Sequence, residues 1–397
     1  MGAGTDIINI SGSVLGGLFT TEYLKNVSIN LKDSVYTTTN EGTTTVTIQR
    51  FKENYSITAT NVVPGQPIEP LFPTDMFYIY EANVKQKIIA EFEDLGKGED
   101  DYTDLGILMY NYFVPDVIRD YINRNDPKHL MIVTPTEHDI PWEFMHNGKD
   151  FWCTKYNMGR VLGVISEYSK AADRRITRGK NVRLAVIADP QNNTDSARKE
   201  GEEIKRLLQD HEGMDIQIIN DSETTKMGVL KTLVRGGYDI IHYAGYADFN
   251  PNDPIKSALH LKDGKLTYGE ISRLELGKSR PVVFINACSS SENAFVGDKA
   301  VSLATAFLRA GALAYIGTMW PIKNTVAAEF ASKFYTNLRK LRVGESLRLA
   351  RTEIMKDHPA SDWVPYSLFG DPMRTIATVN GQHFSYKYRT ADKPKSG

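Results

Sequence analysis

The sequence predicts an α/β protein with a mainly parallel sheet sandwiched by helices, preceded by a small N-terminal β-rich unit. From residue 181 onward, short apolar strands alternate with amphipathic helices, beginning with VRLAVIAD and ARKEGEEIKRLLQDH. This alternation is typical of a parallel sheet that helices cover on both faces. Residues 27–63 differ, because they are rich in Thr, Val, Ile and Tyr and contain turn signals at NEG and KEN. They predict the small β unit.

The helices and strands after residue 181 follow in a regular order. The later strands are expected at MDIQIIN, YDIIHYAG, PVVFINA and LAYIGTMW, with helices such as TTKMGVLKTLVRG and AVSLATAFLRAG between them and a DG turn in LHLKDGKLTY. In open α/β sheets the active crevice lies at the carboxyl ends of the strands. The two strands that end in HYAGYADF and in NACSSSENAFVGD therefore carry the candidate site.

The upstream part has a different texture and suggests the domain limits. LGILMYNYFVPDVIRDYI has helical spacing with a break or a new helix start at Pro115, and HLMIVTP predicts a buried strand. VVPGQPIEPLFP predicts a connector, and the acidic EFEDLGKGEDDYTD a solvated joint. We therefore divide the chain into a β-rich unit over 1–85, a helix-and-strand segment over 86–180, a regular core over 181–377 and a flexible tail over 378–397.

Composition excludes several classes of partner and cofactor. Lys and Arg total 47 against 49 Asp and Glu, a net charge of −2, so no electrostatic argument favours nucleic acid or an anionic membrane as a direct partner. Two cysteines build no disulfide framework, which predicts a reducing compartment. With no basic leader and no uninterrupted apolar span, we expect a cytoplasmic protein. No Gly-rich phosphate loop and no metal-ligand spacing occurs, so we expect no cofactor and no metal.

Cys288 stands where PVVFINAC leaves a buried strand for a loop of three serines. A cysteine there could project into the crevice as a nucleophile, with nearby backbone N–H groups free to bind an oxyanion. The alternative is a small apolar residue at a strand end, and the position of Cys288 alone favours this alternative. Cys153, among aromatics in FWCTKY, is expected in the core.

Several motifs between Leu105 and Ile376 occur in one order at ordinary spacings: LGILMYNYFVPDVI, HLMIVTPTEHDIPWEFMHNGKDF, DIIHYAGYADF, LHLKDGKLTYGEI, VVFINACSSS, GDKAVSLATAFLRAGALAYIGTMWPI and WVPYSLFGDP. Together they resemble the CHAT domain, a caspase-like cysteine peptidase module found mainly in bacteria and related to caspases and separase. The resemblance implies a caspase-like sheet, with 86–180 as the first part of the module and 181–377 as its core. The first hundred residues lie outside it.

The resemblance also implies a nucleophilic cysteine and a histidine base on neighbouring strand ends. Cys288 matches the nucleophile, although three serines replace the usual Glu, Thr and Gly. The histidine stretch of the family reads His, any residue, Ala, any residue, His, Gly, and its second histidine is catalytic. Here the first position is His242, the second is Tyr246 and the Gly is Ala247. The expected oxyanion donors are the backbones of Cys288 and Ala247, whose methyl group we expect to crowd a substrate carbonyl.

Two further residues match family positions near the cleft. Asp298 in GDKA and Trp320 in MWPI are candidates for a substrate side-chain pocket, although Asp298 also suits a helix N-terminus. His129 and His138 are interpreted as structural or surface residues.

His242 is poorly placed to replace the missing base. Four residues of strand span ~13 Å, whereas a base must come within ~3 Å of the thiol. Because His242 follows a buried run, we expect a core histidine. Tyr246 is a weak base, since the reference pKa of a phenol is about 10. It could instead fill the pocket or hydrogen-bond the thiol.

Two functions remain open. The first is a pseudopeptidase that binds a protein or peptide, or regulates one, in a bacterial signalling or defence assembly. The second is an active cysteine endopeptidase that uses Cys288 with His242 or a partner-supplied group as base. The N-terminal β unit is a hypothetical recognition or assembly surface.

Overall fold

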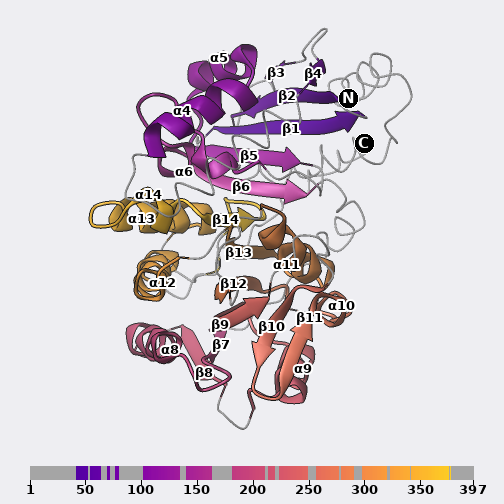
Figure 1. Ribbon diagram of the computed structural model, residues 1–397, viewed down its shortest axis with the longest axis vertical. Helices are drawn as coiled ribbons and strands as arrows, with labels where there is room; N and C mark the ends of the chain where they lie inside the picture. Colours follow the sequence, from indigo (N-terminus) through magenta and orange to yellow (C-terminus); the bar gives the residue numbers. More distant parts are fainter. Residues whose placement is uncertain are drawn as a thin grey trace, which may run out of the picture.

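The computed structural model describes residues 42–51, 54–63, 69–71, 77–79, 102–134, 140–162, 181–210, 213–219, 223–248, 256–276, 279–289, 297–319, 322–339, 341–374 and 376. Within these ranges one sheet of 14 strands runs along the molecule (Figure 1). Its main path is β11-β10-β9-β12-β13-β14-β6-β5-β1-β2-β3, while β7 joins the first half of β9 and β8 lies beyond β7.

The β-rich segment is continuous with this sheet. Strands β1 (Thr43–Phe51) and β2 (Asn54–Val62) form an antiparallel pair, and β3 (Glu69–Leu71) and β4 (Phe77–Ile79) pair with β2. β1 also pairs in parallel with β5 (His129–Thr134), so this part shares the sheet of the chain that follows. The domain limits set from the sequence stay predictions.

Two helices, two short helical segments and one further strand complete the upper part in Figure 1. Helix α4 (Tyr102–Phe113) ends just before Pro115 and α5 (Asp116–Asn125) begins just after it, which confirms the predicted break. The remaining elements there are η1 (Trp142–Phe144), α6 (Trp152–Lys155) and β6 (Asn157–Leu162).

The second part alternates strands and helices as predicted. Its elements are β7 (Val182–Ala188), α8 (Asp195–Leu208), β8 (Met214–Ile218), α9 (Lys226–Arg235), β9 (Ile240–Asp248), β10 (Ala258–Leu261), β11 (Gly264–Thr267), α10 (Tyr268–Ile271), β12 (Val282–Ser289), α11 (Gly297–Arg309), β13 (Ala314–Thr318), α12 (Asn324–Leu338), α13 (Val343–Ile354), α14 (Ala360–Trp363) and β14 (Tyr366–Phe369). β7, β9, β12 and β13 are parallel neighbours, and β10 and β11 pair antiparallel with their neighbours. β14 is antiparallel to β13 and parallel to β6. The mainly parallel α/β sheet is confirmed.

Each face of the sheet has its own apolar core. Helices α8, α12 and α13 contribute to the cluster on one face, and α9, α10 and α11 to the cluster on the other, as the two sides of Figure 1 show. Successive residues of β9 alternate between the clusters, since Ile240 belongs to the first and Ile241 to the second.

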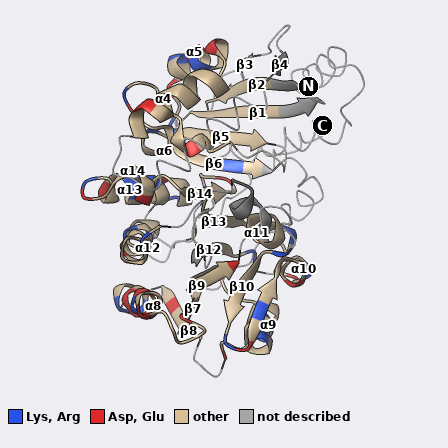
Figure 2. Ribbon diagram, in the orientation of Figure 1, with Lys and Arg blue, Asp and Glu red and all other residues tan. Residues whose placement is uncertain are grey.

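Residues of both charge signs are interspersed along the helices (Figure 2), in keeping with the near-neutral composition. Among the described residues, no helix combines the length and apolar character needed to cross a bilayer. No group of His, Cys, Asp and Glu in these ranges could hold a metal ion.

Candidate active site

The ends of β9 and β12 bring the two main candidate positions together. The strands are parallel and pair in the register Phe284 with His242, Asn286 with Ala244 and Cys288 with Tyr246. Neighbouring strands lie about 4.8 Å apart, so positions 246 and 288 are adjacent at the carboxyl edge of the sheet. The backbone therefore offers the neighbouring strand ends that the resemblance implied. The Cys288 side chain lies outside the described part of the structure.

Tyr246 is half-buried at this edge, and its hydroxyl makes no hydrogen bond to the described residues. The phenol that fixes the backbone here belongs to Tyr243, whose hydroxyl lies 2.6 Å from the carbonyl oxygen of Tyr246 and 2.7 Å from that of His260. Burial raises the pKa of Tyr243 far above its ordinary value, so the hydroxyl remains a proton donor. This contact ties β9 to β10 directly beside the candidate site.

Gly245 makes room for that contact. A Cβ at this position would lie 2.9 Å from the Tyr243 hydroxyl oxygen and 3.1 Å from Cδ of Pro190, which follows β7. A side chain at 245 would therefore push against both the tyrosine and the loop after β7. The glycine in HYAGYADF serves packing at the sheet edge.

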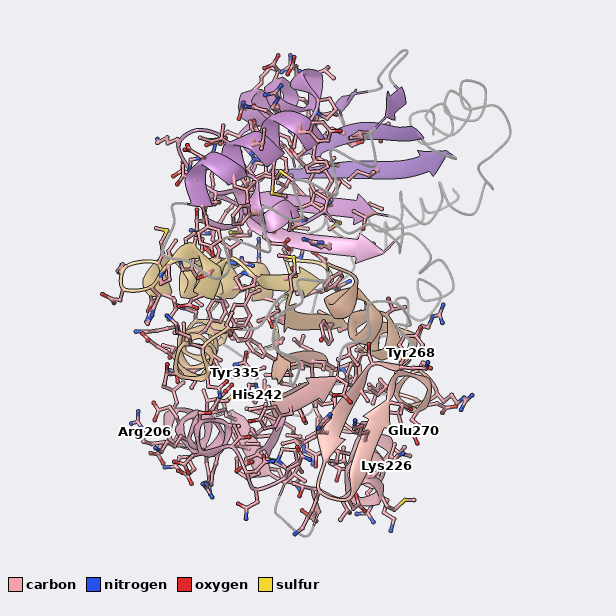
Figure 3. All side chains as sticks on the ribbon, viewed as in Figure 1. Arg206, Lys226, His242, Tyr268, Glu270 and Tyr335 are labelled. Carbon is pink, nitrogen blue, oxygen red and sulfur yellow. The ribbon has the colours of Figure 1, made fainter. Side chains whose placement is uncertain are left out.

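His242 lies four residues before Tyr246 and is completely buried. Its Nδ1 is 3.0 Å from the Tyr335 hydroxyl, and its ring centroid is 5.3 Å from that of Phe284. Its Nε2 is 3.0 Å from Oε1 of Glu200, although the approach is not aligned as a hydrogen bond. Figure 3 shows His242 and Tyr335 beside each other on the α12 side of the sheet. The placement agrees with the expected core histidine and gives no support to a role as base.

Asn286, two residues before Cys288, belongs to the same buried group. Its Nδ2 donates to Oε1 of Glu200 at 2.6 Å and to the Ala327 carbonyl at 2.9 Å. Its Oδ1 accepts a hydrogen bond of 2.9 Å from the Tyr366 hydroxyl. The side-chain amide of Asn286 is thus hydrogen-bonded to residues of α8, α12 and β14. We call Glu200, His242, Asn286, Tyr335 and Tyr366 the Glu200 cluster.

The structure places a second imidazole near Tyr246 that sequence reasoning missed. His260 of β10 has Nε2 2.8 Å from Oδ1 of Asp248, although the approach is not aligned as a hydrogen bond, and its side chain is 15% exposed. Lys265 of β11 contacts the other oxygen of that carboxylate. In the antiparallel pairing of β9 and β10, Leu259 is opposite Ala247, so His260 is the next residue toward Tyr246. The DG turn predicted the β10–β11 hairpin, but nothing local showed that it pairs with the end of β9.

The other candidates differ in how far they are described. Ala247 is fully buried in the core cluster of the second face, so its methyl group lies away from the face of Tyr246 and does not support the expected crowding. Asp298 is the second residue of α11, which suits its helix N-terminal interpretation, and its side chain lies outside the described part. Trp320 and His138 also lie outside the described residues.

Two residues interpreted as structural are indeed in the interior. Cys153 is fully buried, and burial raises the pKa of its thiol to about 12, so it is an inert core residue. His129 is fully buried between Asn157 and Arg342, at 3.4 Å and 3.0 Å.

A family model described as "CHAT domain" matches residues 104–371, about the range over which the sequence resembles that family. The chain belongs to the CHAT-domain family. The structure is similar to that of the Arg specific cysteine proteinase gingipain R, with a TM-score of 0.50, 13% identity, and coverage of 74% of this chain and 77% of that chain. It is also similar to the Saccharomyces cerevisiae separase in its complex with securin, with a TM-score of 0.48, 11% identity, and coverage of 88% and 31%. The fold is thus caspase-like.

Curated relatives match a smaller part of this CHAT protein. Tetratricopeptide repeat protein 28 of Mus musculus and of Homo sapiens is 24% identical over 132 residues, which make up 32% of this chain. The match spans only 5% of each relative.

The chemical capacity of this CHAT module follows from what lies beside position 288. A cysteine is a usable nucleophile even when unassisted, because a reference pKa near 8.5 leaves a few per cent of thiolate at pH 7. In strand register the neighbour is a phenol, whose reference pKa of about 10 makes it a poor proton acceptor. Among the described residues, the register partner of position 288 on β9 is thus a phenol and not an imidazole.

Proposed function

We propose that this CHAT module is a pseudopeptidase, which holds a protein or peptide partner at the ends of β9 and β12 without cutting it efficiently. We place it in a bacterial signalling or defence assembly in the cytoplasm, as a binding or regulatory component. One observation carries the proposal: Tyr246 is the register partner of Cys288, while the nearby histidine of β9 is buried in the core.

The cost of losing the base supports this function. A positioned acid or base contributes roughly 10² to 10⁴ in rate. His242 cannot supply it without leaving a core in which Tyr335 and Phe284 pack against its ring. The strand ends, however, keep a fixed backbone arrangement, because the Tyr243 hydroxyl and the Glu200 cluster hold them from the two faces. A fixed edge can bind an extended segment without any base.

The direct test is a cleavage and binding assay on the full chain. The protein would be incubated with bacterial proteins encoded close to its gene and with a library of unstructured peptides, and products would be identified by mass spectrometry. Binding that persists in Cys288→Ala, with no product that depends on Cys288, is expected. Site-specific cleavage that disappears in Cys288→Ala would refute the proposal.

A second candidate is an active cysteine endopeptidase with a base other than residue 246. The observation that favours it is the pair of His260 and Asp248, since an imidazole beside a carboxylate is the usual arrangement of a general base. Of the bases considered from the sequence, a partner-supplied group stays open, and His242 is disfavoured by its burial.

A matched pair of variants separates the two functions. His358 lies 3.2 Å from Glu329 in a similarly accessible pair on α12 and the segment after α13, so His358→Ala controls for loss of an imidazole–carboxylate contact. If His260 acts as the base, His260→Ala should lower any Cys288-dependent cleavage by roughly 10²-fold or more while His358→Ala leaves it unchanged. Equal activity in both variants would exclude His260 as the base.

A further inference from the structure

We propose that Glu200 is a positioning residue that sets how the ends of β9 and β12 meet. Its carboxylate lies between the two strands, 3.0 Å from Nε2 of His242 and 2.6 Å from Nδ2 of Asn286. The inference concerns the geometry of the cleft and holds for a binding module as well as for a peptidase.

Because Glu200 is buried, its contacts constrain the relative position of β9 and β12. Glu200 is 3% exposed, His242 is fully buried and Asn286 is 5% exposed. A carboxylate in such surroundings is costly unless donors satisfy it, and it accepts but does not donate hydrogen bonds while ionised. The Asn286 amide donates a hydrogen bond to one oxygen of this carboxylate, and His242 Nε2, a second potential donor, lies 3.0 Å from the same oxygen without hydrogen-bond alignment. Sliding either strand would move one of these nitrogen atoms away from the buried carboxylate.

The rest of the Glu200 cluster holds these donors in place. Tyr335 of α12 contacts Nδ1 of His242, and Tyr366 of β14 donates to Oδ1 of Asn286. Burial, together with the charge of Glu200, raises the pKa of Tyr335 well above its ordinary value, so its hydroxyl stays protonated. The cluster thereby connects helices of one face to the two strands whose ends carry positions 246 and 288.

The position of the cluster links it to the cleft rather than to general packing. Asn286 precedes Cys288 by two residues, about 7 Å along a strand, and His242 precedes Tyr246 by four. The anchored pairs therefore lie directly below the strand ends. Apolar residues of similar volume would fill this space at lower cost in desolvation, but they would not fix a hydrogen-bonding register.

A disulfide between the strand ends can measure their relative position. In Tyr246→Cys, the new thiol and Cys288 occupy register partners about 4.8 Å apart, within the Cα separations that disulfides span. Cys153 does not interfere, because it is fully buried with a thiol pKa of about 12. The measured quantity is the rate at which this disulfide forms in a glutathione buffer of fixed potential.

Three changes would be added to the Tyr246→Cys protein: Glu200→Ala, Glu200→Gln and, as a control, Leu208→Ala. Leu208 is a fully buried residue of the same helix that lines a small hollow together with Tyr335, but it has no polar atom to offer the cluster, so its truncation lowers stability without removing a polar contact. Because disulfide closure requires specific geometry, Glu200→Ala should slow it about tenfold at conditions where all variants are folded. Glu200→Gln keeps a carbonyl acceptor for Asn286 and should recover part of the rate.

The comparison with Leu208→Ala makes the inference falsifiable. Closure in Leu208→Ala should match that of the parent, even though its melting temperature is lower. If Glu200→Ala closes as fast as Leu208→Ala, Glu200 is only a packing residue and the inference is wrong. If Glu200→Ala does not fold, Glu200→Met takes its place, because it fills the space without an acceptor oxygen: a rate equal to that of the parent overturns the proposal.

Discussion

Restoring a histidine at position 246 tests most directly whether the chemistry of this site depends on that residue. Cys288 and position 246 are register partners about 4.8 Å apart, so an imidazole at 246 lies within reach of a thiol at 288. The half-buried Tyr246 leaves space for the smaller ring. An imidazolium beside a cysteine lowers the thiol pKa, and a fall from about 8.5 to about 6 is within the usual range.

The magnitude depends on pH in a characteristic way. Near pH 6 the thiolate fraction rises from about 0.3% to about 50%, roughly 160-fold. A less basic thiolate is also less nucleophilic, by about 13-fold for this shift at a Brønsted coefficient of about 0.45. Alkylation in Tyr246→His should therefore be about 12-fold faster near pH 6, about 2-fold faster near pH 7 and about 10-fold slower near pH 9. The two profiles cross slightly above neutrality.

The assay is the second-order rate of iodoacetamide labelling of Cys288 across this pH range, followed by mass spectrometry. Labelling of the native protein reports Cys288, because Cys153 is fully buried and its thiol pKa is raised to about 12. Tyr246→Phe is the control, since it removes the hydroxyl without adding a base. If the pH profile of the labelling rate in Tyr246→His runs parallel to that of the wild type without a crossing, the side chain at position 246 does not influence the Cys288 thiol. The pseudopeptidase argument then fails.

Two further predictions concern stability. Gly245→Ala should lower the free energy of unfolding by about 1–3 kcal/mol, because its Cβ would lie 2.9 Å from the Tyr243 hydroxyl oxygen. Denaturant unfolding should show that adding Tyr243→Phe recovers part of this loss. An unchanged unfolding midpoint in Gly245→Ala would contradict the packing role of this glycine. Burial raises the pKa of the Asp362 carboxyl, and Lys323 opposes this with a smaller effect. Between the ordinary and the raised pKa, the native state therefore binds more protons than the unfolded state. The contribution of Asp362 to stability falls as pH rises through that window. Asp362→Asn should thus raise the melting temperature at neutral pH and lose that advantage below the window, whereas a lower melting temperature at pH 7 would show that the charge is favourable.

Local periodicity was enough to predict the second half of the fold. Apolar strands separated by amphipathic helices leave few arrangements other than a parallel sheet, so the strands ending in HYAGYADF and NACSSS appear as β9 and β12. The pairing of β1 with β5 could not be predicted in the same way. It joins residues some 86 positions apart, Thr43 with His129, and no local pattern specifies a partner at such a separation.

The site was predictable only in part, for the same reason. The tyrosine at position 246 is a matter of residue identity, which the sequence shows directly. His260 comes near it because β7 pairs with β9 only as far as Ala244, which leaves the end of β9 free to pair with β10. In helix α8, Glu200 and Glu203 look alike in the sequence, and only the contacts of the fold show that the first is buried beneath two strands and the second is paired with Arg206 at the surface.

The contrast between position 246 and its surroundings is what the pseudopeptidase proposal must explain. Cleavage requires a base within hydrogen-bond reach of the thiol, but recognition of an extended segment requires only that the strand ends be held still. The Tyr243 hydroxyl and the Glu200 carboxylate hold them, each with a buried polar group that packing alone would not need. A site that had lost both cleavage and binding would not need the buried Tyr243 hydroxyl and Glu200 carboxylate. A site that binds without cutting needs both groups but does not need the imidazole. The disulfide rate and the Tyr246→His profile measure these two properties separately.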